Sequence, residues 1–315
     1  MVKFDPGSLF YLGFLGVPSA FGVGPEWPEV FMLFFLFGLW PLVAPLLAGG
    51  DRGRSARFLL SQVLFELLPW RLAASLAQLA GQLAPLVRYR GRFPDAESYE
   101  QSVRLTLPFE GSWTAVNGGV TRDTSHSWEL LAQRYAYDFL RERDGATHEG
   151  DGADCADYHC FGEPVVAPAP GTVVRATDGI RDFPRPGTGW TEWRTWDIRG
   201  NHVVLDHGNG EYSLLAHLQE DSVCVSVGDE VERGERLGAC GNSGNSTEPH
   251  IHYQLQDTPN FFLAAGLPPT FSDFERERDG DRERVAAGYV TAPATVAPRT
   301  RGDGPSAPST EATRT

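Results

Sequence analysis

Two uncharged apolar runs near the amino terminus differ from everything that follows them. The first, residues 9–23 (LFYLGFLGVPSAFGV), is short and contains Pro18. The second, residues 30–48 (VFMLFFLFGLWPLVAPLLA), is long enough to cross a bilayer as a helix. We therefore predict a membrane hairpin in which the second run is the stronger span.

A third apolar stretch extends from Phe58 to Val87, but it carries charges. It contains Glu66, Pro69 and Arg71. Each charge near the centre of a bilayer costs roughly 2.5–3.5 kcal/mol on insertion scales. The charges therefore favour an amphipathic helix on the membrane surface over a third span.

Arginine clusters flank this third stretch and set the predicted topology. Residues 51–57 and residues 88–92 each carry three arginines. A two-span hairpin places Lys3 and the first cluster on the cytoplasmic side, so the remainder of the chain stays in the cytoplasm. If residues 58–87 also cross, the remainder faces outside. We favour the cytoplasmic side, and the exterior side stays open as the alternative.

From Gln101 onwards the pattern is that of β-strands. Short runs rich in Val, Thr and aromatic residues alternate with Gly, Asn, Asp and Pro. Predicted strands include residues 103–107, 171–176, 202–206 and 212–217, whereas a helical pattern is confined to residues 129–133. The pattern predicts a mainly β domain, a two-sheet antiparallel β-sandwich, that the hydrophobic membrane helices precede.

Changes in composition define the domain boundaries. Residues 1–93 form the membrane-associated helical region, residues 94–107 a linker and first strand, and residues 108–288 the β domain. Residues 289–315 consist mostly of Ala, Pro, Thr, Arg and Gly. Such a segment has little to bury, so we expect a disordered tail.

Charge and cysteine usage narrow the function classes. The formal net charge is −14 and Lys3 is the only lysine, which argues against nucleic acid as a partner. The four cysteines, Cys155, Cys160, Cys224 and Cys240, show no CxxC spacing, which argues against a zinc knuckle. They fit two disulfides, 155–160 and 224–240, or buried free thiols, and the sequence leaves both open.

The candidate chemistry centres on His250-Ile251-His252. Residues two apart on a β-strand point to the same face, so the two imidazoles share one surface while Ile251 points to the core. The preceding residues 241–246 (GNSGNS) favour a turn. Two imidazoles on a rigid sheet suit a transition metal or proton transfer, although a plain pair of surface histidines has the same spacing.

A carboxylate and further histidines lie upstream of this pair. The alternating stretch QRYAYDF places Asp138, Ala136 and Arg134 on one face of a strand, and His126 lies twelve residues before Asp138. His217 closes the predicted strand YSLLAHL. Two histidines and one carboxylate, with water as the fourth ligand, are a usual catalytic zinc site.

Three segments resemble the lysostaphin-like (beta-lytic) zinc metalloendopeptidases. They read CFGEPVVAPAPGTVVRATD, GNHVVLDHGNGEYSLLAHLQ and VSVGDEVERGERLGACGNSGNSTEPHIHYQ. The resemblance covers residues 160–257 closely and extends more weakly on both sides. It implies a β-sandwich with a groove, related to lipoyl domains (the duplicated hybrid motif). It also implies a bound zinc and the hydrolysis of peptide bonds in cell-wall peptides.

The resemblance implies a role for each matching residue. His252 and Asp138 match metal ligands, whereas His250 and His217 match catalytic histidines. The family usually has a further histidine four residues before the aspartate, and this chain has Arg134 there. An arginine cannot bind zinc as a neutral ligand. We therefore expect His126 to replace the missing ligand.

The expected function is that of a membrane-anchored zinc metalloendopeptidase acting on cell-wall or small-residue-rich peptides. Zinc would polarise the scissile carbonyl and lower the pKa of its water to about 7. His217 and His250 would stabilise the oxyanion or pass a proton to the leaving amine. The expected partners are a peptide substrate and the lipid membrane, and the oligomeric state stays open.

Two other function classes compete with this expectation. The departure at Arg134 motivates a non-hydrolytic peptide-binding module on the same fold. A phosphoryl carrier would also use paired histidines, but it needs no carboxylate ligand, so Asp138 counts against it.

Overall fold

The computed structural model describes residues 27–39, 67–278 and 281–299, with short pieces between residues 9 and 25 and between residues 57 and 65. The chain divides into two compact units, Met1–Leu64 and Phe65–Thr315. In the first unit a 3-10 helix, η2, spans Trp27–Leu39. Of the predicted span at residues 30–48, residues 40–48 lie outside the described residues, as does most of the run at residues 9–23. Across the part of the chain that is described, no helix combines the length and the apolarity needed to cross a bilayer.

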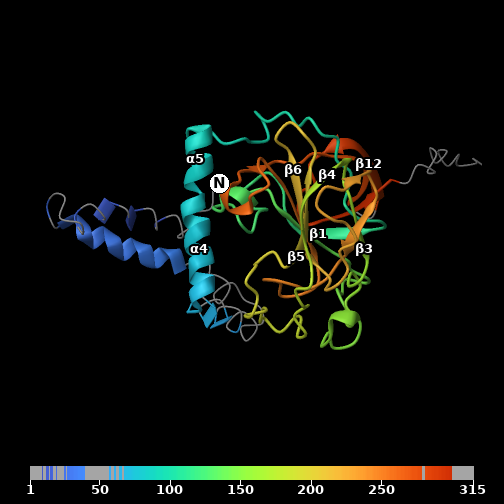
Figure 1. Ribbon diagram of the computed structural model, residues 1–315, viewed down its shortest axis with the longest axis horizontal. Helices are drawn as coiled ribbons and strands as arrows, with labels where there is room; N and C mark the ends of the chain where they lie inside the picture. The colour runs from blue at the N-terminus through green and yellow to red at the C-terminus, as the bar shows by residue number, and fades with distance from the viewer. Residues whose placement is uncertain are drawn as a thin grey trace, which may run out of the picture. The chain divides into compact units, whose positions relative to one another are not determined.

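The second unit begins with two consecutive helices, α4 (Pro69–Gly81) and α5 (Leu83–Tyr89) (Figure 1). Pro69 stands in the first turn of α4, where its missing N–H has no helical partner to lose. Gly81 lets α4 approach the short helix η5 (Phe261–Leu263), because a Cβ at this position would lie 2.0 Å from the Phe262 carbonyl oxygen. The helices therefore pack on the β domain through a close backbone contact.

Two polar contacts reinforce this packing. Arg88 forms an ion pair with Asp257, and the Gln82 Oε1 atom accepts a hydrogen bond of 2.9 Å from the Leu131 backbone N–H. The described part of the predicted stretch 58–87 is thus largely a surface helix pair seated on the β domain.

Within the described residues, eleven strands form one sheet and two form another, and their ladders are all antiparallel. The large sheet has the order β12-β11-β13-β1-β2-β9-β6-β5-β4-β7, and β10 adds to β9. Its strands are β1 (Trp113–Asn117), β2 (Tyr137–Leu140), β4 (Gly171–Thr177), β5 (Asn201–Asp206), β6 (Tyr212–Leu218), β7 (Glu230–Val231), β9 (Ile251–Gln256), β10 (Gly266–Leu267), β11 (Phe271–Arg278), β12 (Asp281–Gly288) and β13 (Ala294–Pro298). The small sheet pairs β3 (Pro164–Val166) with β8 (Arg236–Ala239).

The prediction of a mainly β, antiparallel domain is therefore confirmed, with two sheets of very unequal size. One apolar core joins residues of both sheets, including Val165 from β3, Leu237 from β8 and Ile251 from β9. Aromatic rings fill its centre, where Tyr137 and Phe139 stack with ring centroids 5.5 Å apart. Burial of such large rings contributes much of the stability of a domain of this size.

The predicted first strand at residues 103–107 is wrong. Leu105 and Leu107 are buried as expected, but Leu105 forms only an isolated bridge with Phe271. The Leu105 carbonyl accepts from the Ser272 N–H at 2.8 Å, and the Thr106 N–H donates to the Pro168 carbonyl at 2.8 Å. The backbone groups of this segment bond to different loops, so no continuous ladder forms.

The prediction of a disordered tail from residue 289 is also wrong for the described residues. β13 pairs with β1 on one side and with β11 on the other. Val290 and Val296 are 0% and 1% exposed, and the Val290 carbonyl accepts from the Tyr137 hydroxyl at 2.7 Å. A few well-placed apolar residues suffice to integrate a segment whose average composition is polar and proline-rich.

We predict that truncation after Gly288 destabilises the β domain, because it removes β13 and two fully buried valines. Burial of a valine is worth about 1.5–3 kcal/mol, so the free energy of unfolding should fall by roughly 3–6 kcal/mol. Truncation after Arg299 is the matched control and should have little effect. Chemical denaturation measures both, and equal stability of the two truncated proteins would contradict the integrated position of β13.

Candidate functional site

His126, Asp138 and His252 form a group of three metal-ligand side chains. One donor atom from each lies within 4.8 Å of the others. The His252 Nδ1 atom is 3.0 Å from Asp138 Oδ1, and the His126 Nδ1 atom is 3.4 Å from Asp138 Oδ2. The structure thus brings together the three residues that the sequence indicated as ligands. This is the one group of its kind among the described residues.

The pairing of β2 with β9 sets the centre of this group. Asp138 on β2 and His252 on β9 are direct cross-strand partners, and such partners have Cβ atoms about 4.5–5.5 Å apart. Both strands lie in the middle of the large sheet, and β6 follows β9 in the strand order. The two side chains therefore stand on a rigid surface, although 114 residues separate them in sequence.

The strand β1 supports Asp138 from the other side. Asn117 pairs with Asp138 in the β1–β2 ladder, and its Nδ2 atom donates to Asp138 Oδ2 at 3.0 Å. Gly118 follows with φ +125, and a Cβ there would lie 2.2 Å from the Tyr137 ring. Only glycine permits this close passage. The chain then leads into the loop that carries His126 to the rim of the site.

His217 is held in a strained backbone conformation at the end of β6. Its φ is +61, which is costly for a residue with a Cβ. Three hydrogen bonds fix it there. Its N–H donates to the Arg199 carbonyl at 2.9 Å, its carbonyl accepts from the Gly241 N–H at 3.0 Å, and its Nδ1 atom lies 2.8 Å from the Ser243 carbonyl. Non-glycine residues in such conformations cluster at functional sites.

Two glycines allow the turn that carries Ser243 to approach. Gly200 and Gly244 have φ +64 and +79, and a Cβ on Gly244 would lie 2.3 Å from the Gly200 nitrogen. The two turns therefore contact each other backbone to backbone. This contact places the Ser243 carbonyl where His217 can donate to it.

His250 precedes β9 and lies beside His217, with ring centroids 4.8 Å apart. Its Nδ1 atom is 2.8 Å from the Glu248 carbonyl, and its Nε2 atom is 3.6 Å from Asp138 Oδ1. A carbonyl accepts hydrogen bonds only, so the Nδ1 atoms of His217 and His250 carry the proton when these rings are neutral. The lone pair then resides on Nε2 in both residues.

Arg134 does not share a strand face with Asp138, so that part of the prediction is wrong. The chain forms a 3-10 helix, η3 (Leu131–Gln133), whose C-cap is Arg134, and β2 begins only at Tyr137. The Arg134 guanidinium lies over the rings of Phe93 and Trp128, at 5.2 and 5.0 Å from their centroids. His126, and not Arg134, lies beside Asp138.

Gln254 determines which nitrogen of His252 faces the candidate metal site, and the sequence-based prediction missed it. Its Oε1 atom lies 3.1 Å from His252 Nε2. Its Nε2 atom donates to the Ala132 carbonyl at 3.1 Å and to Gln256 Oε1 at 2.6 Å, which fixes the orientation of the amide. The His252 Nε2 atom must therefore carry a proton, and Nδ1 is left to bind a metal.

Asp138 is a buried carboxylate, 8% exposed, whose ion-pair partners are His126, His250 and His252. Burial would raise the pKa of Asp138, but the positive charges of these imidazoles and the hydrogen bond from His252 hold it well below its usual value. Burial disfavours the charged form of His252, yet the bond to Asp138 raises its pKa. A divalent cation would satisfy the carboxylate and displace the His252 Nδ1 proton, so this donor set fits a metal.

The electrostatics of His217 suit a different role. Burial, followed by the charges of His250 and His252, lowers the pKa of His217 well below its usual value. Its ring is therefore neutral near neutral pH. A neutral imidazole with a free Nε2 lone pair can accept a proton.

Two other histidines, His202 and His207, have structural roles. His202 is 0% exposed, and its Nδ1 atom lies 2.8 Å from the Gly200 carbonyl. Burial, followed by the charge of Arg199, lowers the pKa of His202 to about 4. His207 lies 2.7 Å from the Pro170 carbonyl and 2.8 Å from the Ser213 hydroxyl, so both of its nitrogens are engaged within the fold.

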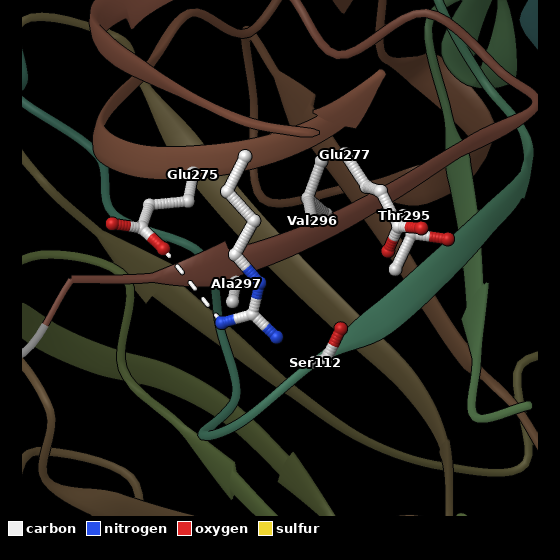
Figure 2. A pocket seen from close by; sticks show the side chains of 7 residues that line it. Ser112, Glu275, Glu277, Thr295, Val296 and Ala297 are labelled. Carbon is white, nitrogen blue, oxygen red and sulfur yellow. Dashed lines mark ion pairs between the residues drawn. The ribbon is translucent and has the colours of Figure 1, made fainter. Parts of the chain in front are cut away.

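A separate shallow pocket lies over β11, β12 and β13, where Arg282 and Glu275 approach to 3.8 Å (Figure 2). Glu277, Ser112 and Val296 also line it, and none of the site histidines does. Its chemistry is that of a solvated surface ion pair.

Part of the β domain matches a known protein family. Residues 151–261 match the family model described as Peptidase family M23. The matched segment contains His217, His250 and His252 but begins after His126 and Asp138. The match supports the M23 peptidase family for this segment. The proximity of His126 and Asp138 to His252 comes from the structure alone.

Curated relatives are similar over a short segment. Peptidoglycan DD-endopeptidase ShyA of Vibrio cholerae is 45% identical over 86 residues, which are 27% of this chain and 20% of the relative. DD-carboxypeptidase/endopeptidase Mpg of Neisseria meningitidis is 37% identical over 87 residues, 27% of this chain and 17% of the relative. The matched segments thus span a fifth or less of the length of these relatives.

Two of the solved structures that are similar to this chain are peptidases. The catalytic domain of the antimicrobial peptidase lysostaphin from Staphylococcus simulans is 20% identical, covers 50% of this chain and 88% of that chain, and has a TM-score of 0.28. A zinc containing peptidase from Vibrio cholerae is 17% identical, covers 56% of this chain and 39% of that chain, and has a TM-score of 0.27. Peptidases of family M23 depend on zinc, and the group of His126, Asp138 and His252 supplies fitting donors.

We predict that Gln254→Met weakens zinc binding about 10–100-fold, as loss of a hydrogen-bond partner to a metal-bound histidine typically does. Methionine has a similar length but cannot hold the His252 Nε2 proton as an amide oxygen does. Competition with a chelator measures the affinity. Gln256→Met is the matched control, because it leaves Gln254 bonded to His252 and to the Ala132 carbonyl. Equal zinc affinity in the wild type and in Gln254→Met would show that Gln254 does not select the tautomer.

Proposed function

We propose that the β domain is a zinc metalloendopeptidase in which His126, Asp138 and His252 hold the metal and His217 and His250 serve the reaction. The observation that carries the proposal is the convergence of three ligand side chains, within 4.8 Å of one another, beside two further imidazoles. His126 supplies the third donor, so Arg134 no longer favours a binding module without a metal. The match to the M23 family supports the same chemistry.

When bound, zinc supplies a Lewis acid and lowers the pKa of its water to about 7. The residues of this chain orient the reacting groups and move protons. Asp138 offsets the positive charge of the metal and, tied by Asn117, fixes the geometry of the site. His250 and His217 each have a lone pair on Nε2 when neutral, so one of them can accept a proton from the attacking water and pass that proton to the leaving amine.

The proposed substrates are cell-wall peptides or peptides rich in small residues. The support comes from the relatives, since ShyA is named a peptidoglycan DD-endopeptidase and Mpg a DD-carboxypeptidase/endopeptidase. Metal-assisted hydrolysis of an amide uses a Lewis acid, a proton acceptor and a proton donor for the leaving amine. This chain holds residues for all three tasks.

We further propose that the protein works at a lipid membrane, to which the helix pair α4–α5 contributes. The pair exposes apolar side chains to solvent, among them Trp70, Leu72, Leu76, Leu79, Leu83, Leu86 and Val87. Arg88, Arg90 and Arg92 follow this apolar surface. Apolar side chains next to a basic cluster are typical of helices that lie at the surface of an anionic membrane. The arginine clusters favour the cytoplasmic side of the membrane. Cell-wall peptides lie on the exterior side, which is the alternative that the sequence leaves open.

We predict that His217→Asn and His250→Ala keep zinc but lose turnover by a factor on the order of 10²–10³, as the loss of one transition-state contact does. Asparagine at position 217 tolerates the left-handed conformation, so the backbone is preserved. The release of new amino groups from purified peptidoglycan measures turnover, and elemental analysis measures zinc. Zinc-loaded wild-type protein that releases none would contradict a peptidoglycan substrate.

We predict that the ligand variants behave differently, because they remove metal donors. His126→Ala and Asp138→Ala should lose both zinc and activity, whereas His159→Ala, which is not part of the group, should keep both. A chelator should likewise abolish wild-type activity and added zinc should restore it. Full zinc content in Asp138→Ala would overturn the ligand assignment.

We predict that the unit starting at Phe65 binds vesicles of anionic phospholipid through the α4–α5 surface. Leu76→Glu and Leu79→Glu, at positions 57% and 63% exposed, should reduce the bound fraction in a flotation assay. Val227→Glu is the matched control, since Val227 is 65% exposed but lies far along the chain from these helices. Equal flotation of all three variants would argue against a lipid-binding role for the helix pair.

A further inference from the structure

Two fully buried cysteines, Cys160 and Cys240, lie together in the main core. Both are 0% exposed. Cys160 precedes β3, and Cys240 directly follows β8. Because β3 and β8 pair with each other, the fold brings together two cysteines that are far apart in sequence.

Backbone hydrogen bonds hold Cys240 against the turn that begins at Cys160. The Glu163 N–H donates to the Cys160 carbonyl at 3.1 Å and closes this turn. The Cys240 N–H donates to the Glu163 carbonyl at 2.8 Å, and the Gly162 N–H donates to the Cys240 carbonyl at 2.8 Å. These bonds continue the β3–β8 ladder by one step beyond the pair Pro164–Ala239.

The two thiol groups contact each other directly. Burial, and then the hydrogen bond between the side chains of Cys160 and Cys240, raises the pKa of the Cys240 thiol well above its usual value. A thiol of this kind does not ionise readily in the folded protein, so it is a poor nucleophile and a poor metal ligand. The Cys240 thiol nevertheless lies against the Cys160 thiol.

The other two cysteines have different surroundings. Cys155 donates to the Phe183 carbonyl at 3.2 Å and accepts from Asn242 at 3.6 Å. Cys224 is exposed, and its thiol donates to the Arg236 carbonyl at 3.2 Å. The contacts thus join Cys160 with Cys240 and do not favour the pairings 155–160 and 224–240 that the sequence spacing suggested.

We propose that Cys160 and Cys240 are a disulfide-forming pair that is oxidised when the chain folds in the presence of a low-molecular-weight disulfide. The thiolate of one cysteine attacks the small disulfide, forms a mixed disulfide and releases one small thiol. The second cysteine attacks the mixed disulfide, forms the Cys160–Cys240 bond and releases the second small thiol. Two electrons pass to the small disulfide, and the two cysteine protons end on the two thiols released.

The bond would brace the backbone of the candidate site. Cys160 donates to the Pro249 carbonyl at 3.0 Å, and Pro249 directly precedes His250. Gly241, next to Cys240, donates its N–H to the His217 carbonyl. The bond would close a loop of about 80 residues, and long loops gain most from a cross-link in the chain-entropy model. The proposal depends on the fold and not on hydrolysis.

The state of this pair also reports the compartment in which the β domain folds. Disulfides persist in oxidising compartments and are rare where thiols are kept reduced. An oxidised pair in protein taken directly from cells would therefore place the domain outside, against the cytoplasmic prediction.

The test refolds the full chain in a mixture of oxidised and reduced glutathione. Free thiols are then alkylated under denaturing conditions and mapped by peptide mass spectrometry. We expect alkylation of Cys155 and Cys224 and a cross-linked peptide that joins Cys160 to Cys240. A reductant should then lower the midpoint of thermal unfolding.

Serine variants provide the controls. Cys155→Ser and Cys224→Ser should retain the cross-linked peptide, whereas Cys160→Ser and Cys240→Ser should lose it. Alkylation of all four cysteines in the refolded wild type would overturn the proposal, as would a cross-link from Cys155. The mapping of the wild type decides the question even if a serine variant fails to fold.

Discussion

The pairing of β2 with β9 is the constraint on which the site depends. It sets the carboxylate of Asp138 beside the ring of His252, on adjacent strands in the middle of the large sheet. A buried carboxylate without a cationic partner is costly. The fold surrounds Asp138 with the imidazoles of His126, His250 and His252. The Arg134 guanidinium lies over aromatic rings instead. This arrangement leaves Asp138 available for a metal.

Unusual backbone conformations position the other residues of the site around Asp138 and His252. Gly118 passes over Tyr137 and leads to His126. The contact between Gly200 and Gly244 positions Ser243, which in turn holds His217 in its left-handed conformation. Each of these features has a cost in the folded state. Because the surrounding hydrogen bonds fix them together, the imidazoles are oriented before any substrate arrives, which is how a protein lowers reorganisation at an active site.

Local patterns in the sequence predicted the strands β4, β5 and β6 and placed the paired histidines at the start of β9. They could not supply the register between β2 and β9, because a contact across 114 residues leaves no local signal. Gln254 could have been found, since it lies two residues after His252 and therefore on the same face of the strand. Asn117 and Ser243 could not, because their roles depend on which strand or turn is adjacent in space. The prediction of a disordered tail was wrong because the average composition of the segment does not reveal that Val290 and Val296 are buried.

The central claim is that one zinc ion is bound by His126, Asp138 and His252. The most direct measurement is anomalous X-ray diffraction at the zinc absorption edge from crystals of the zinc-loaded protein. We expect a single strong peak about 2 Å from one donor atom of each of the three residues, with Nδ1 as the donor of His252. A peak coordinated by His217 or His250, or one that His126 does not approach, would contradict it.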